Sequence, residues 1–235
     1  MATTANQSEF SYLGKGIYSV SEASRLSNVS PQRIFRWVRG YNYGSALLKI
    51  RMEPIWNRDY TVIEKHYSLS FQDLIEIRFI NAFRTYGISW RTIRAAAIRA
   101  AQILEISHPF STKRFYTDRK TILLRVAKES ENIELIDLAE NQYAIDEILT
   151  PHLYEGLDFS ELDVAQRWWP IGRQKHVVID PNRNFGKPIV ENYNIPTETI
   201  FSLYKNNPSS KSIADWFEIE EEYIKHAIEF EKSIA

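Results

Sequence analysis

The 235-residue chain contains no cysteine, which excludes disulfides and thiolate metal sites and fits a reducing compartment. It also lacks long apolar runs. No segment approaches the roughly 20 apolar residues that a membrane span needs, and the opening MATTANQSEFSYLGKG has no run of signal-peptide length. These absences predict a soluble cytoplasmic protein without a membrane partner.

Signatures of catalysis are absent too: the chain has no phosphate-binding glycine loop, no G-x-S-x-G elbow and no H-E-x-x-H pair. His176 and Asp180 could meet on one face of a strand. A lone His–Asp pair in an apolar strand, however, is more often a satisfied hydrogen bond than a catalytic dyad. We therefore predict that the protein is not an enzyme and uses no metal ion or other cofactor.

The net charge of −1 hides a strong asymmetry along the chain. Residues 1–120 hold 18 Lys and Arg against 9 Asp and Glu, whereas residues 121–235 hold 11 against 21. A basic half joined to an acidic half is typical of a polyanion-binding part linked to a part with another task. Chance clustering of solvated charges is the alternative explanation.

The stretch NVSPQRIFRWVRG, residues 28–40, has the start and stop signals of a short helix. Ser30 can cap it, Pro31 suits its first turn, and Gly40 suits the position after its end. One side is apolar. One flank carries an arginine at every third position, with no acidic residue among them: Arg33, Arg36 and Arg39.

The flanking segments predict a winged helix-turn-helix. SVSEASRLSN, with Ser21 as its cap, predicts a first helix that a tight turn joins to the arginine helix. After Gly40 we expect a two-stranded ribbon, Leu47–Met52 with Tyr60–Ile63, which would form the wing. Arginine suits bidentate contacts with guanine and with phosphates. The predicted DNA-binding residues are Ser30, Gln32, Arg33, Arg36 and Arg39 on the helix, and Lys49, Arg51 and Arg58 on the wing.

Two longer helices should follow the ribbon. The first begins after Ser70, with Asp73 completing a near capping box, and the second is alanine-rich and begins after Ser89. The residues His108 and Pro109 should close it. Further on, the sequence predicts a hairpin turning at 118–119, then a short strand or turn and a helix that stops at Pro151.

From residue 156 the pattern changes to loops with short strands, and the last forty residues read as three helices. We place a domain boundary near residue 155, giving domains 1–155 and 156–235. The acidic tract EIEEEYIKHAIEFE is more easily explained as the solvated side of an amphipathic helix than as a metal site, with Ile219, Ile224 and Ile228 facing inward. The predicted fold class is mainly α with small β-ribbons (α+β), ending in a homeodomain-like three-helix unit.

Two sets of motifs carry a family resemblance. YSVSEASRLSNVSPQRIFRWVRGY with LSFQDLIEIRFINAFRTYGISWRTIR resembles the MerR-like winged helix-turn-helix, without the cysteines of its metal sensors. RWWPIG, VVIDPNRNFGKPIV and NIPTETIFSLYKNNPSSKSIADWFEIEEEYIKHAIEFE resemble a small helical domain of bacterial antitoxins. Together they are similar to VapB-type antitoxins.

This resemblance implies a type II antitoxin that represses its own operon and neutralises a PIN-type ribonuclease toxin. The implied partners are double-stranded operator DNA, the toxin and a second copy of the chain, and the protein would join the bacterial nucleoid when bound to DNA. We expect Glu220, Glu221 and Glu222 to meet the basic surface of the toxin. One alternative is a stand-alone regulator with a small-molecule pocket at Trp168 and Trp169. Another is a nuclease that uses scattered carboxylates.

Overall fold

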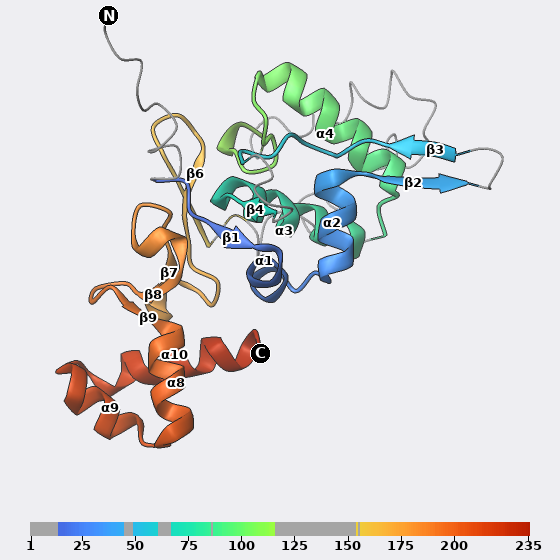
Figure 1. Ribbon diagram of the computed structural model, residues 1–235. Coiled ribbons are helices and arrows are strands. Elements are labelled where there is room, and N and C mark those ends of the chain that lie inside the picture. The colour runs from blue at the N-terminus through green and yellow to red at the C-terminus, as the bar shows by residue number, and fades with distance from the viewer. Residues whose placement is uncertain (1–13, 45–48, 61–66, 86, 116–153, 155) are drawn as a thin grey trace, which may run out of the picture. The chain divides into compact units, whose positions relative to one another are not determined.

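The computed structural model describes residues 14–44, 49–60, 67–85, 87–115, 154 and 156–235, and its fold is a mixture of helices and small sheets (Figure 1). This confirms the predicted α+β class. The chain divides into two compact units. The N-terminal unit comprises Ser19–Glu155 with Phe159–Ala165, and the C-terminal unit comprises Met1–Tyr18, Gly156–Asp158 and Gln166–Ala235.

The N-terminal unit opens with helix α1 (Val20–Ser27), which follows the short strand β1 (Tyr18–Ser19). The prediction that Ser21 caps this helix is wrong, because Ser19 is the N-cap. The Ser19 hydroxyl accepts from the backbone N–H of Glu22 at 3.1 Å, and the Glu22 carboxylate accepts from the backbone N–H of Ser19 at 2.8 Å. This capping box satisfies two N–H groups that a helix start leaves free.

A tight turn leads into helix α2 (Pro31–Arg39), as predicted. Asn28 adopts a left-handed conformation in the turn, and Val29 is buried beside it. Pro31 occupies the first turn of α2 and Gly40 ends the helix. The Ser30 side chain makes no capping hydrogen bond; its carbonyl instead accepts from Arg33 and Ile34.

The ribbon that follows differs from the prediction. Strand β3 (Lys49–Met52) lies where a strand was expected, but its partner is β2 (Tyr41–Gly44), which precedes it. The two strands run antiparallel (Figure 1). Their register sets Tyr41 opposite Met52. Neighbouring strands pair across a short connection at little entropic cost, and Pro54 cannot donate to a ladder beyond β3. Of the expected partner Tyr60–Ile63, only Tyr60 is described; it is buried and lies outside any strand.

Strand β4 (Ser68–Leu69) precedes the core helix of this unit, α3 (Phe71–Thr85). The predicted capping box is confirmed, because Asp73 accepts from the Ser70 N–H at 2.8 Å and the Ser70 hydroxyl accepts from the Asp73 N–H at 3.1 Å. Most of α3 is buried, including the charged residues Asp73 and Glu76, so burial is not confined to one apolar stripe. Helix α4 (Trp90–Leu104) begins at the predicted cap, Ser89, but ends at a left-handed Glu105, before the expected stop at His108.

The C-terminal unit contains a sheet in the order β5-β6-β7-β8-β9. Its strands are β5 (Leu157–Phe159), β6 (Ala165–Trp168), β7 (Val177–Ile179), β8 (Pro188–Val190) and β9 (Ile195–Pro196), with 3-10 turns η2 (Arg173–Lys175) and η3 (Asn184–Gly186). The strands from β6 to β9 pair antiparallel. The short strands predicted in this region are therefore present.

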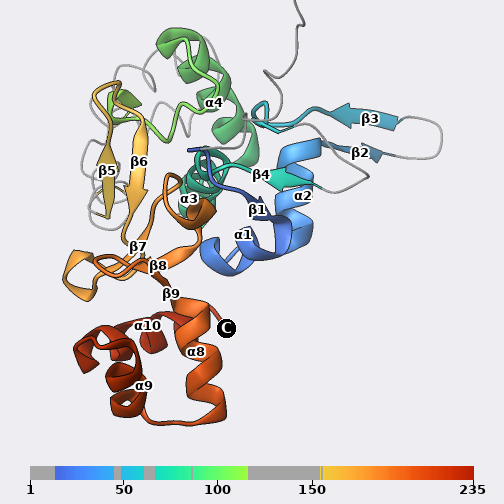
Figure 2. The ribbon, with the colours of Figure 1, turned by 60° about the vertical axis from the view of Figure 1, so that its left-hand side comes forward.

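Three helices complete the C-terminal unit, as predicted: α8 (Thr197–Asn206), α9 (Ser210–Phe217) and α10 (Glu221–Ser233) (Figure 2). Their core includes Ile200, Ile213, Ile224 and Ile228, whereas Ile219, expected to face inward, is only partly buried. The hairpin predicted at 118–119 and the helix predicted to stop at Pro151 lie outside the described residues. No helix in the described ranges is long and apolar enough to cross a membrane.

Candidate nucleic-acid interface

Helix α2 presents its arginines to solvent. Ile34, Trp37 and Val38 are buried, with exposures of 0%, 5% and 2%, so the apolar side faces the core as predicted. The opposite flank carries exposed residues that include Ser30, Gln32, Arg33, Arg36 and Arg39. The sequence spacing alone sets this arrangement, because residues three apart lie on one side of a helix.

Two arginines assigned to the wing also hold the end of α2. Arg51 donates from Nη2 to the carbonyl of Arg39 at 2.7 Å, and Arg58 donates from Nε to the carbonyl of Val38 at 3.2 Å. The final carbonyls of a helix lack partners within it, and cations favour this end of the helix dipole. Strand β3 and the segment after it, where Arg58 lies outside any strand, are therefore joined to α2 by charged side chains.

The three basic residues predicted to lie on the wing, Arg58, Arg51 and Lys49, differ in exposure and in whether their charges already have partners. Arg58 is partly buried, and its guanidinium lies 4.6 Å from the ring centroid of Tyr67, so it has little freedom to follow a DNA backbone. Arg51 is exposed but also faces Glu53, with 3.5 Å between Nε and Oε1. Lys49 is exposed on β3. Of the three, Lys49 is the residue best placed to meet a phosphate.

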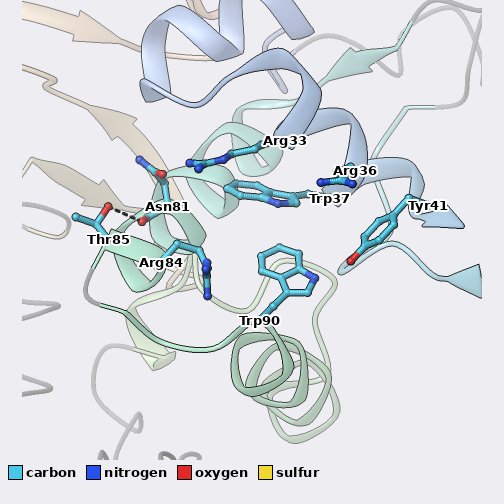
Figure 3. A pocket seen from close by; sticks show the side chains of 8 residues that line it. All are labelled: Arg33, Arg36, Trp37, Tyr41, Asn81, Arg84, Thr85 and Trp90. Carbon is cyan, nitrogen blue, oxygen red and sulfur yellow. Dashed lines mark hydrogen bonds between the residues drawn. The ribbon is translucent and has the colours of Figure 1, made fainter. Parts of the chain in front are cut away.

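A cavity of about 420 Å³ opens beside α2 (Figure 3). Its wall is formed by α2, the start of β2, the end of α3 and the start of α4. The residues that line it are Arg33, Arg36, Trp37, Tyr41, Asn81, Arg84, Thr85 and Trp90. Three of them are arginines and none is acidic, so the cavity is a concentrated positive region of the N-terminal unit.

The cavity is built from aromatic rings with cations around them. The rings of Trp37 and Trp90 lie 5.5 Å apart and 29° from parallel, while the Arg36 guanidinium lies 4.8 Å from the ring centroid of Tyr41. Arg84 donates to the carbonyl of Ile88 at 2.6 Å, which holds its side chain at the α3–α4 junction. In the described part of the chain the Arg33 guanidinium makes no hydrogen bond or ion pair, so its charge is available to a ligand.

Sequence reasoning found the α2 side of this cavity and missed the other side. Asn81, Arg84, Thr85 and Trp90 lie about fifty positions from α2, and no spacing rule links them to it. The sequence did carry a weak signal. Arg84 stands just before the end of one predicted helix and Trp90 just after the cap of the next, so both should lie at the junction of these helices. The folded chain is needed to bring this junction to α2.

A buried polar cluster lies deeper in the same unit. Asp73 Oδ1 accepts from the Trp56 indole N–H at 2.5 Å and faces His108 Nε2 at 3.0 Å, while Glu76 Oε1 accepts from the Ser111 N–H at 3.0 Å. Burial raises the pKa of Glu76 to about 8. Burial lowers the pKa of His108, but its hydrogen bond to Asp73 and the charge of that carboxylate outweigh burial and leave the pKa raised.

This cluster has the ligand types of a metal site but serves the fold first. Ligand atoms of Asp59, Asp73 and His108 lie within 4.8 Å of one another. Both oxygens of Asp73, however, already accept hydrogen bonds, one of them in the cap of α3. We therefore regard the cluster as a structural network that joins the start of α3 to the segment after α4.

The residues singled out in the C-terminal unit are mostly engaged in packing. His176 and Asp180 do not form the pair considered from the sequence: His176 ends η2 and lies 3.9 Å from Glu191, while Asp180 accepts from the Asn182 N–H at 2.9 Å. Trp168 and Trp169 are 4% and 3% exposed. Their burial fits the packing of a core better than the lining of an open pocket.

The three glutamates at the start of α10 differ in their surroundings. Glu221 accepts from the Ser210 hydroxyl at 2.5 Å and pairs with Lys225 at 3.1 Å, and these contacts lower its pKa. Glu220 and Glu222 are exposed. Only these two remain open for a partner, apart from a 3.9 Å approach of Glu222 to His226.

Comparison with known proteins places the fold without assigning an activity. A family model described as "Protein of unknown function (DUF433)" matches residues 177–230, the segment from β7 to α10. The fold resembles the crystal structure of Rv2018 from Mycobacterium tuberculosis, with a TM-score of 0.69 and 20% identity over 90% of this chain and 96% of that one. No curated protein matches the sequence.

Proposed function

We propose that the protein is a DNA-binding antitoxin whose N-terminal unit binds operator DNA through α2. The exposed arginine flank of α2, without an acidic neighbour on the helix, supports the DNA-binding part. A helix of this width enters the major groove, where arginine reads guanine by paired hydrogen bonds. Arg84, on the adjoining helix junction, extends the positive surface towards the phosphates.

The test measures how the full-length protein binds two duplexes by fluorescence anisotropy. One duplex is taken from the DNA upstream of its own coding sequence, and the other has a random sequence. Arg33→Ala and Arg36→Ala should each weaken binding to the first duplex by roughly 1–3 kcal/mol and reduce the preference over the second. Arg91→Ala is the matched control, because Arg91 is exposed on α4 but does not line the cavity.

Equal losses on both duplexes for Arg33→Ala and Arg36→Ala would mean that α2 does not read bases. Unchanged binding would overturn the assignment of the interface to this helix. A salt series completes the experiment, since a protein that neutralises several phosphates loses affinity steeply as salt rises.

The antitoxin part of the proposal rests on the C-terminal unit and on the resemblance of its motifs. Its exposed carboxylates suit a ribonuclease, whose RNA-binding surface must be basic. The test is to express a PIN-type protein from a neighbouring gene, with and without this chain, and to follow growth and RNA cleavage. Cleavage that continues in the presence of this chain, when both proteins are folded and abundant, would refute an antitoxin role.

A further inference from the structure

We propose that the cavity beside α2 binds a small phosphorylated ring compound, of the nucleoside monophosphate class, and that this ligand competes with DNA. The cavity volume of about 420 Å³ lies within the range of small-molecule sites. Its lining supplies the two kinds of group that such a ligand needs, cations for the phosphate and aromatic faces for the base. The competition, though not the binding, rests on the proposed function.

The phosphate would be held by guanidiniums from two helices. Arg33 and Arg36 come from α2 and Arg84 comes from α3, so their side chains reach the cavity from different sides (Figure 3). Like charges gathered in one cavity repel one another, and an anion between them removes this cost. Arginine suits the task because its planar fork can give a phosphate two parallel hydrogen bonds.

The ring would be held by the aromatic part of the lining. Trp90 is half-buried and Trp37 nearly fully buried, so Trp90 and Tyr41 offer the accessible faces. Stacking of a base on an aromatic side chain is sequence-tolerant, because every base has a π-face. Asn81 and Thr85 add polar groups at the rim, where the Thr85 hydroxyl donates to the Asn81 carbonyl at 3.0 Å. The Asn81 side-chain amide makes no hydrogen bond within the described residues and could meet a base edge or a sugar hydroxyl.

The nucleotide would compete with DNA because the two ligands share binding residues. Arg33 and Arg36 line the cavity and also lie on the flank proposed to enter the groove. A guanidinium that makes paired hydrogen bonds with a phosphate in the cavity cannot at the same time make paired hydrogen bonds with a base edge in the groove. A nucleotide in the cavity therefore withdraws two of the groups on which DNA binding depends.

The experiment measures direct binding to the full-length protein by titration calorimetry in the absence of DNA. The probes are AMP, GMP, CMP and UMP, with adenosine and inorganic phosphate as half-ligands. We expect one stoichiometric site for at least one monophosphate, and binding at least about tenfold weaker for either half-ligand. Arg33→Gln should weaken binding about tenfold, since a hydrogen bond to a charged group is lost. Within the described residues the Arg33 guanidinium has no other hydrogen bond or ion pair that this change would remove.

Arg84→Gln and Trp90→Phe test the other wall, with circular dichroism to confirm that each variant is folded. Arg91→Gln is the matched control on α4 and should bind as the parent does. If no monophosphate binds, or if Arg33→Gln and Arg91→Gln weaken binding equally, the proposed ligand site is wrong.

A second arm adds the tightest monophosphate to the protein–DNA complex, against sodium chloride at the same ionic strength. The apparent Kd for DNA should rise in proportion to the nucleotide concentration divided by its own Kd, as in simple competition. Nucleotide binding with no effect on DNA would leave the site in place and overturn the competition. DNA binding that depends on Arg33 and Arg36, without any nucleotide binding, would overturn this inference and leave the proposed function standing.

Discussion

The two units organise their charges in opposite ways. In the N-terminal unit three arginines line one cavity whose lining holds no carboxylate. In the C-terminal unit several cations pair with acids: Lys225 pairs with Glu221 at 3.1 Å, Arg167 pairs with Asp158 at 2.7 Å, and Lys175 pairs with Glu229. The number of charges in a region therefore says less about binding than whether those charges already have partners.

The cores of the two units also differ in the ionisable groups that they bury. Helix α3 carries the ionisable groups Asp73 and Glu76 inward, and both are nearly inaccessible to solvent. The three-helix core of the C-terminal unit is largely aliphatic, with one buried polar pair in which the Thr197 hydroxyl donates to Glu231 at 2.6 Å. Protonation should therefore alter the stability of the N-terminal unit more than that of the C-terminal unit.

The largest expected effect is a loss of stability in the N-terminal unit that leaves the stability of the C-terminal unit unchanged. Gly40 has a φ of +69°, and a Cβ there would lie 2.1 Å from the carbonyl oxygen of Met52. Gly40→Ala should lower the free energy of unfolding of this unit by roughly 3 kcal/mol or more. Hydrogen exchange followed by mass spectrometry reports the two units separately.

Gly87→Ala is the control for this substitution. Gly87 also has a positive φ, +83°, but a Cβ there would meet nothing within 4 Å. It should cost only about 1 kcal/mol, the part that comes from backbone strain. Equal losses at the two positions would show that the contact of α2 with the end of β3 does not restrain the fold.

The next largest expected effect is a dependence of the free energy of unfolding on pH, confined to the N-terminal unit. The pKa of Glu76 is raised from 4.5 to about 8, so the folded state holds this proton more tightly than the unfolded state. The free energy of unfolding that protonated Glu76 contributes is fully present below pH 4.5, and it is lost as the pH rises through about 8. Chemical denaturation between pH 6 and 8 should show the stability falling by about 1 kcal/mol per pH unit. The raised pKa of His108 acts in the same direction.

Glu76→Gln keeps the shape of the side chain and removes this titration. The variant should show a shallower pH slope than the parent and become the more stable of the two above pH 8. Glu105→Gln, at an exposed carboxyl of the same unit, should leave the slope as it is. A slope that survives Glu76→Gln in full would assign the pH dependence to other groups.

Smaller effects should distinguish arginines that stabilise the fold from arginines that contribute to DNA binding. Arg58→Gln should lower stability by about 1–2 kcal/mol, because it removes a charged donor from the Val38 carbonyl, whereas Arg33→Gln should leave stability unchanged. Arg51→Ala should cost less stability, since Arg51 is exposed, and should weaken binding to all DNA sequences alike while reducing the salt slope by about one. Thermal melts and salt titrations measure the two properties independently.

A further small effect on stability is expected in α10. Reversing the exposed pair, Glu220→Lys with Glu222→Lys, should lower stability by about 1 kcal/mol, because it places two cations at the N-terminal end of the helix dipole. Association with a basic partner should slow most strongly at low salt, where steering between unlike charges is strongest. Glu221 is left in place because it holds Ser210 and Lys225. If the double reversal and the neutral Gln pair slow association equally at every salt concentration, charge steering is not the cause.

Much of the fold could be predicted because its signals are local. The Ser70–Asp73 box, Ser89 and the Pro31–Gly40 frame all mark helix ends within a few residues of sequence. Even the error at α1 was a local one, because Ser19 stands three residues before Glu22 and fits the capping box that Ser21 does not. Strand β2 was overlooked because four residues of mixed polarity carry little periodic signal.

The candidate site could be predicted only in part, for a physical reason. The arginine flank of α2 follows from helical spacing, but Arg84 and Trp90 reach it through the packing of α3 and α4 against the core. The contact of Arg58 with the Val38 carbonyl is equally non-local, so a residue assigned to DNA proved to be engaged within the fold as well. Long-range pairing of this kind leaves no periodic trace in a single sequence.

The bonds around the end of α2 have a consequence for protein engineering. Arg51, Arg58 and the Ile55 N–H supply the last carbonyls of the helix with donors, and Gly40 lets the hairpin pass close to it. A helix transplanted from another protein to this position would lack its matching donors, and α2 moved elsewhere would lose its own. The helix and the hairpin therefore depend on each other for stability. An engineered change of the α2 surface should be made by substitution at its exposed positions or by moving residues 31–58 together.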